Sequence, residues 1–181
     1  MNLSIPVPSL VVLVGPSGAG KSTFAARHFR PTEVVSSDRC RALVSDRENN
    51  MAATQAAFRV LHAIAAERLR SGRLTVVDAT NVRPESRKPL IALAREHGCR
   101  AVAIVFDLPE EVCRERNRVR PGRRVPDRVV QRQHEHLTLS IEALAAEGFH
   151  ELFMLDSIEA VESVTIVRAN LVVDKPARPS P

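Results

Sequence analysis

A glycine-rich segment with the spacing G-x-x-x-x-G-K-[ST] constrains this chain more than any other feature. Residues 15–23 read GPSGAGKST, and the apolar run LVVLV at residues 10–14 comes directly before them. Glycines adopt backbone angles that other residues avoid, so such a loop turns its N–H groups inward and, with the following helix N-terminus, forms an anion site. The segment therefore predicts a phosphate-binding loop. The alternative, a glycine-rich turn that binds nothing, leaves the strand, the lysine and the serine unexplained.

The residue types within this loop suit a nucleoside triphosphate. Lys21 is placed to reach the β- and γ-phosphate oxygens, and the Ser22 hydroxyl is placed to ligate Mg²⁺. The predicted nucleotide-binding residues of the loop are Gly15, Pro16, Ser17, Gly18, Ala19, Gly20, Lys21, Ser22 and Thr23. The sequence therefore predicts ATP or another NTP, together with Mg²⁺, as the cofactors.

Apolar runs typical of strands alternate with helical patterns along the chain. Strands are predicted at residues 10–14, 33–36, 74–77, 101–106, 152–155 and 164–167. Helices are predicted at residues 21–29, 37–43, 51–70, 84–97, 109–116 and 127–147. This alternation predicts an α/β fold in which helices flank a mainly parallel sheet and ligands bind beyond the carboxyl ends of the strands. Together with the phosphate loop, the pattern resembles the three-layer, P-loop kinase-like fold. We expect a kinase domain over residues 1–170, with a lid at about 114–134, and a proline-rich tail or linker over residues 171–181.

Composition narrows the class of protein. The chain has 181 residues, 44% of them hydrophobic, which is enough for one domain with a sizeable core. No apolar run approaches the roughly 20 residues of a membrane span, and the N-terminus lacks a signal-peptide pattern, so a cytoplasmic protein without membrane contact is expected. The three cysteines form no CxxC pair, which predicts buried free thiols. Tyr and Trp are absent, which argues against base recognition on large aromatic platforms.

Positive charge is concentrated in one segment. Residues 114–134 contain eight arginines and two carboxylates, whereas the whole chain has a net charge of +5. Planar guanidinium groups suit phosphate oxygens, so we favour a phosphate-facing element over a merely solvated surface. Arg116 and Arg120 have the spacing of one helix face, and Arg123 follows a Pro-Gly break, so these three are predicted to form a lid over the triphosphate. The arginines left for an anionic polymer are Arg124, Arg128 and Arg132.

A carboxylate follows the second predicted strand. Asp38 is expected at its carboxyl end, and Arg41 lies three residues on, one helical turn away. A hydroxyl that attacks phosphorus must lose its proton, and a carboxylate within hydrogen-bond reach accepts it. We therefore predict Asp38, Lys21 and Arg41 as catalytic residues, with the alternative that Ser37 or Asp38 only caps a helix.

A second carboxylate, Asp78, ends the apolar strand TVVD. A strand that ends in an acidic residue resembles the one that holds Mg²⁺ in P-loop proteins, usually through water. We therefore predict Ser22 and Asp78 as the metal-binding residues, while a turn or cap role for Asp78 stays open. The six histidines have no metal-ligand spacing and are expected to be structural.

Several segments together resemble a known family. GPSGAGKSTFAARHF, EVVSSDRCR, LTVVDATNV with RKPLI soon after, and the arginine-rich lid are similar to the kinase module of bacterial polynucleotide kinase-phosphatase, an RNA end-healing and repair enzyme. The similarity covers about residues 1–170. It implies transfer of the NTP γ-phosphate to a 5′-OH polynucleotide end, with Asp38 as the general base. The positions that match the donor site and lid of that family are Lys21, Ser22, Arg41, Arg116, Arg120 and Arg123.

The resemblance also implies partners. The acceptor is a 5′-OH single-stranded RNA or DNA end, and in the longer family protein the kinase precedes a phosphatase and a ligase-like domain. A homodimer is left open. Two other hypotheses remain: a P-loop kinase of a small-molecule hydroxyl, which needs the same loop, base and lid, and a non-catalytic NTP switch or RNA-binding scaffold, which leaves Asp38 and the Lys21–Ser22 pair without a purpose.

Overall fold

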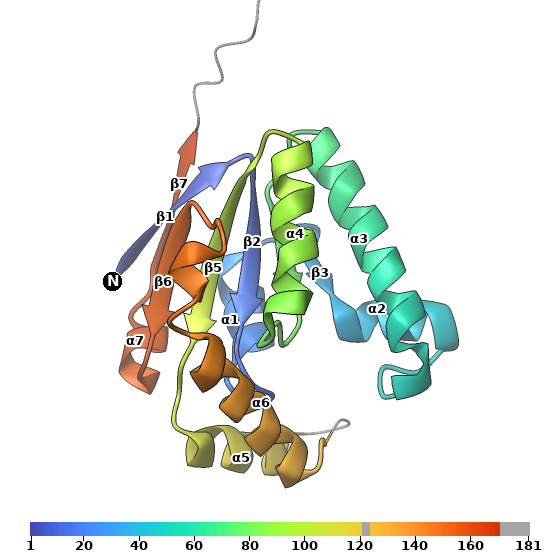
Figure 1. Cartoon of the computed structure of the whole chain (residues 1–181), viewed down its shortest axis with the longest axis vertical. Coiled ribbons are helices and arrows are strands. Elements are labelled where there is room, and N and C mark those ends of the chain that lie inside the picture. Colours follow the sequence, from blue (N-terminus) through green and yellow to red (C-terminus); the bar gives the residue numbers. More distant parts are fainter. Residues whose placement is uncertain (121–123, 171–181) are drawn as a thin grey trace, which may run out of the picture.

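The computed structural model describes residues 1–120 and 124–170. Its centre is a five-stranded, all-parallel sheet with the strand order β3-β4-β2-β5-β6 (Figure 1). These strands are β2 (Ser9–Val14), β3 (Val34–Ser36), β4 (Thr75–Asp78), β5 (Arg100–Phe106) and β6 (Glu151–Leu155). All six residues of β2 are buried because this strand lies between two neighbours and is covered on both faces. The predicted α/β fold with a mainly parallel sheet is confirmed.

Helices follow most strands and form the outer layers. Their bounds are α1 (Lys21–His28), α2 (Ser37–Ser45), α3 (Thr54–Arg70), α4 (Pro84–Glu96), α5 (Glu110–Val119), α6 (Asp127–Ser140) and α7 (Ile158–Glu162), with 3₁₀ turns η1 (Met51–Ala53) and η2 (Leu144–Ala146). One apolar core joins α3, α4 and the end of α6 to one face of the sheet. A second core joins α1 to the other face, so the sheet is buried between two layers.

A two-stranded parallel ribbon forms part of the second layer. It pairs β1 (Asn2–Val7) with β7 (Thr165–Asn170), and Leu3 and Ile5 pack into the core beside α1. The prediction missed β1, because two prolines interrupt a short alternation of apolar and polar residues. The predicted strand at residues 164–167 exists as β7, but it lies in this ribbon rather than in the main sheet.

Two other elements differ from the predictions. A single helix over residues 127–147 is wrong: α6 ends at Ser140, and η2 follows after a turn. Helix propensity in this alanine-rich segment is overridden by packing, since the turn places Leu144 fully in the core. The helix α7 was not predicted, because its five residues are too few for a periodic pattern.

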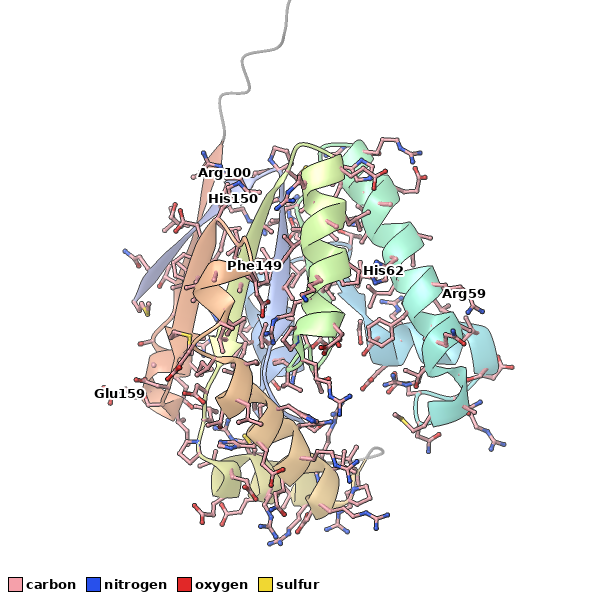
Figure 2. The ribbon with its side chains drawn as sticks, in the orientation of Figure 1. Arg59, His62, Arg100, Phe149, His150 and Glu159 are labelled. Carbon is pink, nitrogen blue, oxygen red and sulfur yellow. The ribbon has the colours of Figure 1, made fainter. Side chains whose placement is uncertain are left out.

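The phosphate loop and the lid helices lie at the carboxyl ends of the strands, where ligands bind in such sheets. The opposite end of the sheet carries Arg100 and His150 (Figure 2). The three cysteines are buried and free, as predicted. The predicted proline-rich tail, residues 171–181, lies outside the described residues. Across the described part of the chain, no helix combines the length and apolarity that crossing a membrane requires.

Candidate active site

The segment between β2 and α1 has the backbone of a loop that wraps around an anion. Gly15, Gly18 and Gly20 have φ values of 154°, 87° and 93°, which side-chain-bearing residues rarely adopt. The helix α1 begins at Lys21, so its first N–H groups face the loop. The Lys21 ammonium is buried and donates to the carbonyl oxygens of Gly15 and Pro16, each at 2.8 Å. The loop is thus shaped by its glycines and held by its own lysine.

The helix α5 packs directly on this loop. A Cβ atom added at Gly18 would overlap the carbonyl oxygen of Cys113, so only glycine allows this approach. Burial raises the pKa of the Cys113 thiol to about 11, although the charges of Lys21 and Arg116 act in the opposite direction. Cys113 is therefore a neutral thiol at pH 7, and its role here is packing.

The loop after β4 is tied to the phosphate loop. Gly15 donates its N–H to the Thr80 carbonyl at 2.9 Å, and the Asn81 side-chain amide donates to the Leu13 carbonyl at 2.8 Å. The buried Arg87 donates to the Asn81 carbonyl at 2.9 Å and pairs with Glu147, to which its Nε donates at 2.7 Å. These bonds fix the end of β4 relative to the phosphate loop.

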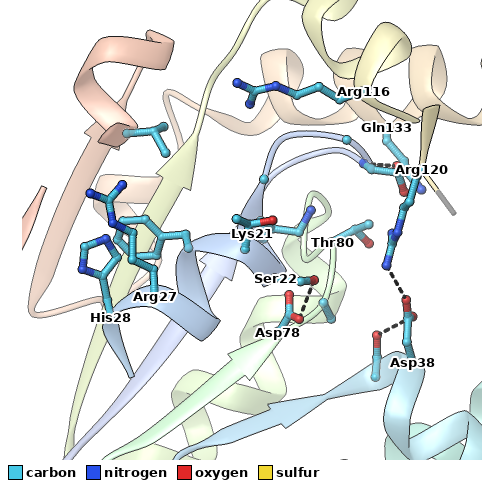
Figure 3. Close-up of a pocket in the computed structure, with 18 of the residues that line it drawn as sticks. Lys21, Ser22, Arg27, His28, Asp38, Asp78, Thr80, Arg116, Arg120 and Gln133 are labelled. Atoms are coloured by element: carbon cyan, nitrogen blue, oxygen red, sulfur yellow. Dashed lines mark hydrogen bonds and ion pairs between the residues drawn. The ribbon is translucent and has the colours of Figure 1, made fainter. Parts of the chain in front are cut away.

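Ser22 and Asp78 meet at this junction. The Ser22 hydroxyl donates to Asp78 Oδ2 at 2.7 Å (Figure 3). The sheet register sets this contact, because Leu13 pairs with Asp78 across β2 and β4. A hydroxyl and a carboxylate are the hard oxygen ligands that Mg²⁺ prefers, so the donor chemistry of the pair fits the predicted metal.

Asp38 lies across the pocket from this pair, in the first turn of α2. It forms an ion pair with the buried Arg41, one turn further along, and Arg41 Nε donates to the Glu48 carbonyl at 2.8 Å. Arg120 reaches the other carboxylate oxygen of Asp38, with 3.7 Å between Nη2 and Oδ2. The alternative of a helix cap by Ser37 or Asp38 is wrong, because Ser36 is the N-cap residue and its side chain accepts the N–H of Arg39.

The segment predicted as a lid contains the second half of α5 and the first half of α6. Arg116 and Arg120 both line the pocket, but Arg120 does not share a helix face with Arg116, because α5 ends at Val119 and Arg120 has extended backbone. Arg123 lies outside the described residues. Asp127 at the start of α6 binds Arg118 on α5 at 2.5 Å, and this hydrogen bond lowers the pKa of Asp127.

These elements enclose one cavity of about 660 Å³. The phosphate loop lies between its two ends. Asp38 lies at one end, and Arg27 and His28 lie at the other (Figure 3). Arg41 on α2 and Ile158 and Val161 on α7 also line the cavity. Pocket residues that the sequence analysis missed as site residues include Met51, Phe58, Gln133, Ile158 and Val161. Phe58 packs against the core as well as lining the pocket.

Comparisons with known proteins agree with this architecture. The chain belongs to the AAA domain family, whose model matches residues 10–143. One curated relative, the transcription factor bHLH140 of Arabidopsis thaliana, is 33% identical over 113 residues, which are 62% of this chain and only 12% of that protein.

Solved structures show the fold. A chain of the Pnkp1/Rnl/Hen1 RNA repair complex matches with a TM-score of 0.67 and 24% identity, over 77% of this chain and 47% of that one. The APS kinase CysC of Mycobacterium tuberculosis, solved with AMPPNP and APS, matches with a TM-score of 0.55 and 21% identity, over 87% of this chain and 93% of that one. The chain thus has a P-loop kinase fold, which implies the use of a nucleotide.

The contact between Gly18 and α5 gives a test of the loop. In Gly18→Ala, the new methyl group would displace α5 or the loop, so we expect ATP affinity to fall by at least about tenfold, or about 1.4 kcal/mol. Gly72→Ala is the matched control, because Gly72 also has positive φ (66°) but open space around a Cβ. Equilibrium ATP binding by both variants measures the difference. Equal affinities in the two would show that the approach of α5 does not shape the loop.

Proposed function

We propose that this chain is a polynucleotide 5′-hydroxyl kinase, which transfers the γ-phosphate of ATP or another NTP to a 5′-OH end of RNA or DNA. The observation that carries the proposal is the acceptor end of the pocket. Asp38 lines the same pocket as the phosphate loop and is paired with two arginines, and Met51, Phe58 and Val119 supply apolar surface to that pocket. A carboxylate suits the proton of a hydroxyl, and apolar surface suits the sugar and base that bear it.

The part of the pocket that the phosphate loop lines would hold the nucleotide. The loop N–H groups, Lys21 and Arg116 would bind the phosphates, while Ser22 and Asp78 would hold Mg²⁺. When bound, Mg²⁺ supplies charge neutralisation on the β- and γ-phosphate oxygens. In this structure Lys21 donates to the carbonyl oxygens of Gly15 and Pro16. The phosphate oxygens of a bound nucleotide would replace these carbonyls as its acceptors.

Transfer would then proceed as an in-line displacement. The 5′-oxygen forms a bond to the γ-phosphorus, the bond from that phosphorus to the β–γ bridging oxygen breaks, and the nucleoside diphosphate leaves. Asp38 accepts the proton of the 5′-hydroxyl as this bond forms. Arg41 orients the carboxylate. Arg120 pairs with the other carboxylate oxygen of Asp38, where it can stabilise negative charge on the transferring group.

The surface of α6 supports a polymeric acceptor over a small one. Arg128 and Arg132 are exposed, one turn apart, and they contact no carboxylate of the described residues at ion-pair distance. A small-molecule acceptor leaves these charges unused, whereas a polynucleotide presents a row of phosphates. The family resemblance to the RNA repair kinase points in the same direction.

The test of the function is transfer of labelled γ-phosphate from ATP and Mg²⁺ to a 5′-OH oligoribonucleotide, with the 5′-phosphorylated strand as control. Label on the 5′-OH strand alone supports the proposal. Intact ATP binding without label on either strand would contradict it and favour a small-molecule hydroxyl acceptor. A DNA strand of the same sequence, assayed in parallel, compares the two acceptor classes.

Asp38→Asn tests the general base. The amide keeps the shape of the carboxylate but accepts no proton, so we expect kcat to fall by about 100- to 10,000-fold with ATP affinity unchanged. Asp46→Asn is the control, because Asp46 ends α2 with φ of 56°, which asparagine tolerates. Near-normal transfer by the Asp38 variant would rule out the base assignment.

A double variant, Arg128→Gln with Arg132→Gln, tests the polymer surface. We expect KM to rise for a long acceptor but not for a dinucleotide. If each arginine neutralises one phosphate, the slope of log affinity against log salt should become shallower by about 1.4 for a single strand. Arg59→Gln with Arg70→Gln removes the same charge from exposed sites on α3. Equal effects of the two double variants would contradict a specific surface on α6.

A further inference from the structure

Gln133 joins the second lid helix to the phosphate loop. It lies on α6, and its side-chain Oε1 accepts the backbone N–H of Ser17 at 2.8 Å (Figure 3). The backbone N–H can only donate, so the oxygen of the amide must face the loop and its NH₂ group must face away from that bond. Gln133 lines the pocket on the same side as Arg120.

The packing of α6 fixes this orientation. Val130 and Leu137, three residues before and four residues after Gln133, are fully buried. Residues at these spacings share a helix face, so Gln133 belongs to the face that α6 turns toward the protein. The start of α6 is also anchored to α5, because Asn117 exchanges two hydrogen bonds with Val125, at 2.8 and 3.2 Å. The bond to Ser17 is thus made by a helix that is held in place.

The loop has a physical need for such a contact. Three of its residues are glycines in conformations that other residues rarely adopt, and glycines leave a loop with many accessible backbone states. Electrostatic stabilisation of a transferring phosphoryl group requires N–H donors that are already aimed before the reaction. The contact of Gly18 with α5 restrains the middle of the loop, and Gln133 restrains the residue before it.

We propose that Gln133 is a positioning residue for phosphoryl transfer, which acts through the Ser17 N–H to hold the phosphate loop in its reactive shape. The proposal rests on the kinase activity proposed above, but not on the identity of the acceptor. Because this effect is exerted on the transition state, loss of the Gln133 acceptor should lower kcat more than it changes the affinity for ATP.

Gln133→Met is the test variant, because methionine has similar length and no strong acceptor. Loss of one neutral hydrogen bond corresponds to a decrease in kcat of about three- to tenfold, with the Kd for ATP changed by less than about twofold. Amide hydrogen exchange at Ser17, followed by NMR, should become faster in the same variant. Gln131→Met on the exposed face of α6, where Gln131 donates a hydrogen bond to Glu135, is the matched control and should change neither quantity.

Gln133→Glu separates positioning from general packing. Glutamate keeps an acceptor for the Ser17 N–H, so it should restore the slow amide exchange and most of the kcat lost in Gln133→Met, while its charge weakens ATP binding. Failure of glutamate to slow the exchange, or equal kcat for Gln133→Met and Gln131→Met, would overturn the proposal. The exchange measurement needs no acceptor, so absence of transfer to oligonucleotides would refute the polynucleotide kinase while leaving the role of Gln133 in the loop measurable.

Discussion

The geometry of the site depends on the hydrogen bonds between the end of β2 and the loop after β4. The Gly15 N–H and the Leu13 carbonyl are both used in hydrogen bonds to this loop, at Thr80 and Asn81. Because β2 and β4 are already paired in register, these bonds leave the phosphate loop and Asp78 no freedom to separate. The contact of Ser22 with Asp78 follows from this constraint, and so does the place where a metal-bound nucleotide would lie.

The helices α5 and α6, which contain most of the segment predicted as a lid, contact the phosphate loop directly. The helix α5 rests on Gly18, and α6 binds Ser17 through Gln133. Asp127 and Asn117 then hold the two helices together. Of the two predicted lid arginines that the structure describes, Arg116 lies within the fixed helix and Arg120 follows its end. Rearrangement on ligand binding is therefore easier for Arg120, which spans the pocket to Asp38.

Local patterns predicted most of the architecture. The phosphate loop, the alternation of strands and helices and the position of Asp38 after β3 all depend on short segments whose chemistry is visible in the sequence. Tertiary contacts decided the rest: β1 pairs with β7, which is far along the chain, and α6 ends at Ser140, after which a turn brings Leu144 into the core. The contact of Gln133 could not be predicted from its neighbours in the sequence. A glutamine on an amphipathic helix is common, and its partner, the Ser17 N–H, lies far away along the chain.

Burial of the ion pair of Asp38 and Arg41 costs the fold desolvation free energy, and this cost points to a role in function. The side chain of Arg41 is only 4% exposed and that of Asp38 17%, so both charges have lost most of their hydration. This burial lowers the pKa of Arg41. A buried ion pair contributes little net stability compared with apolar residues of similar size. A desolvated carboxylate in the same pocket as the phosphate loop is instead what the proposed acceptor site requires.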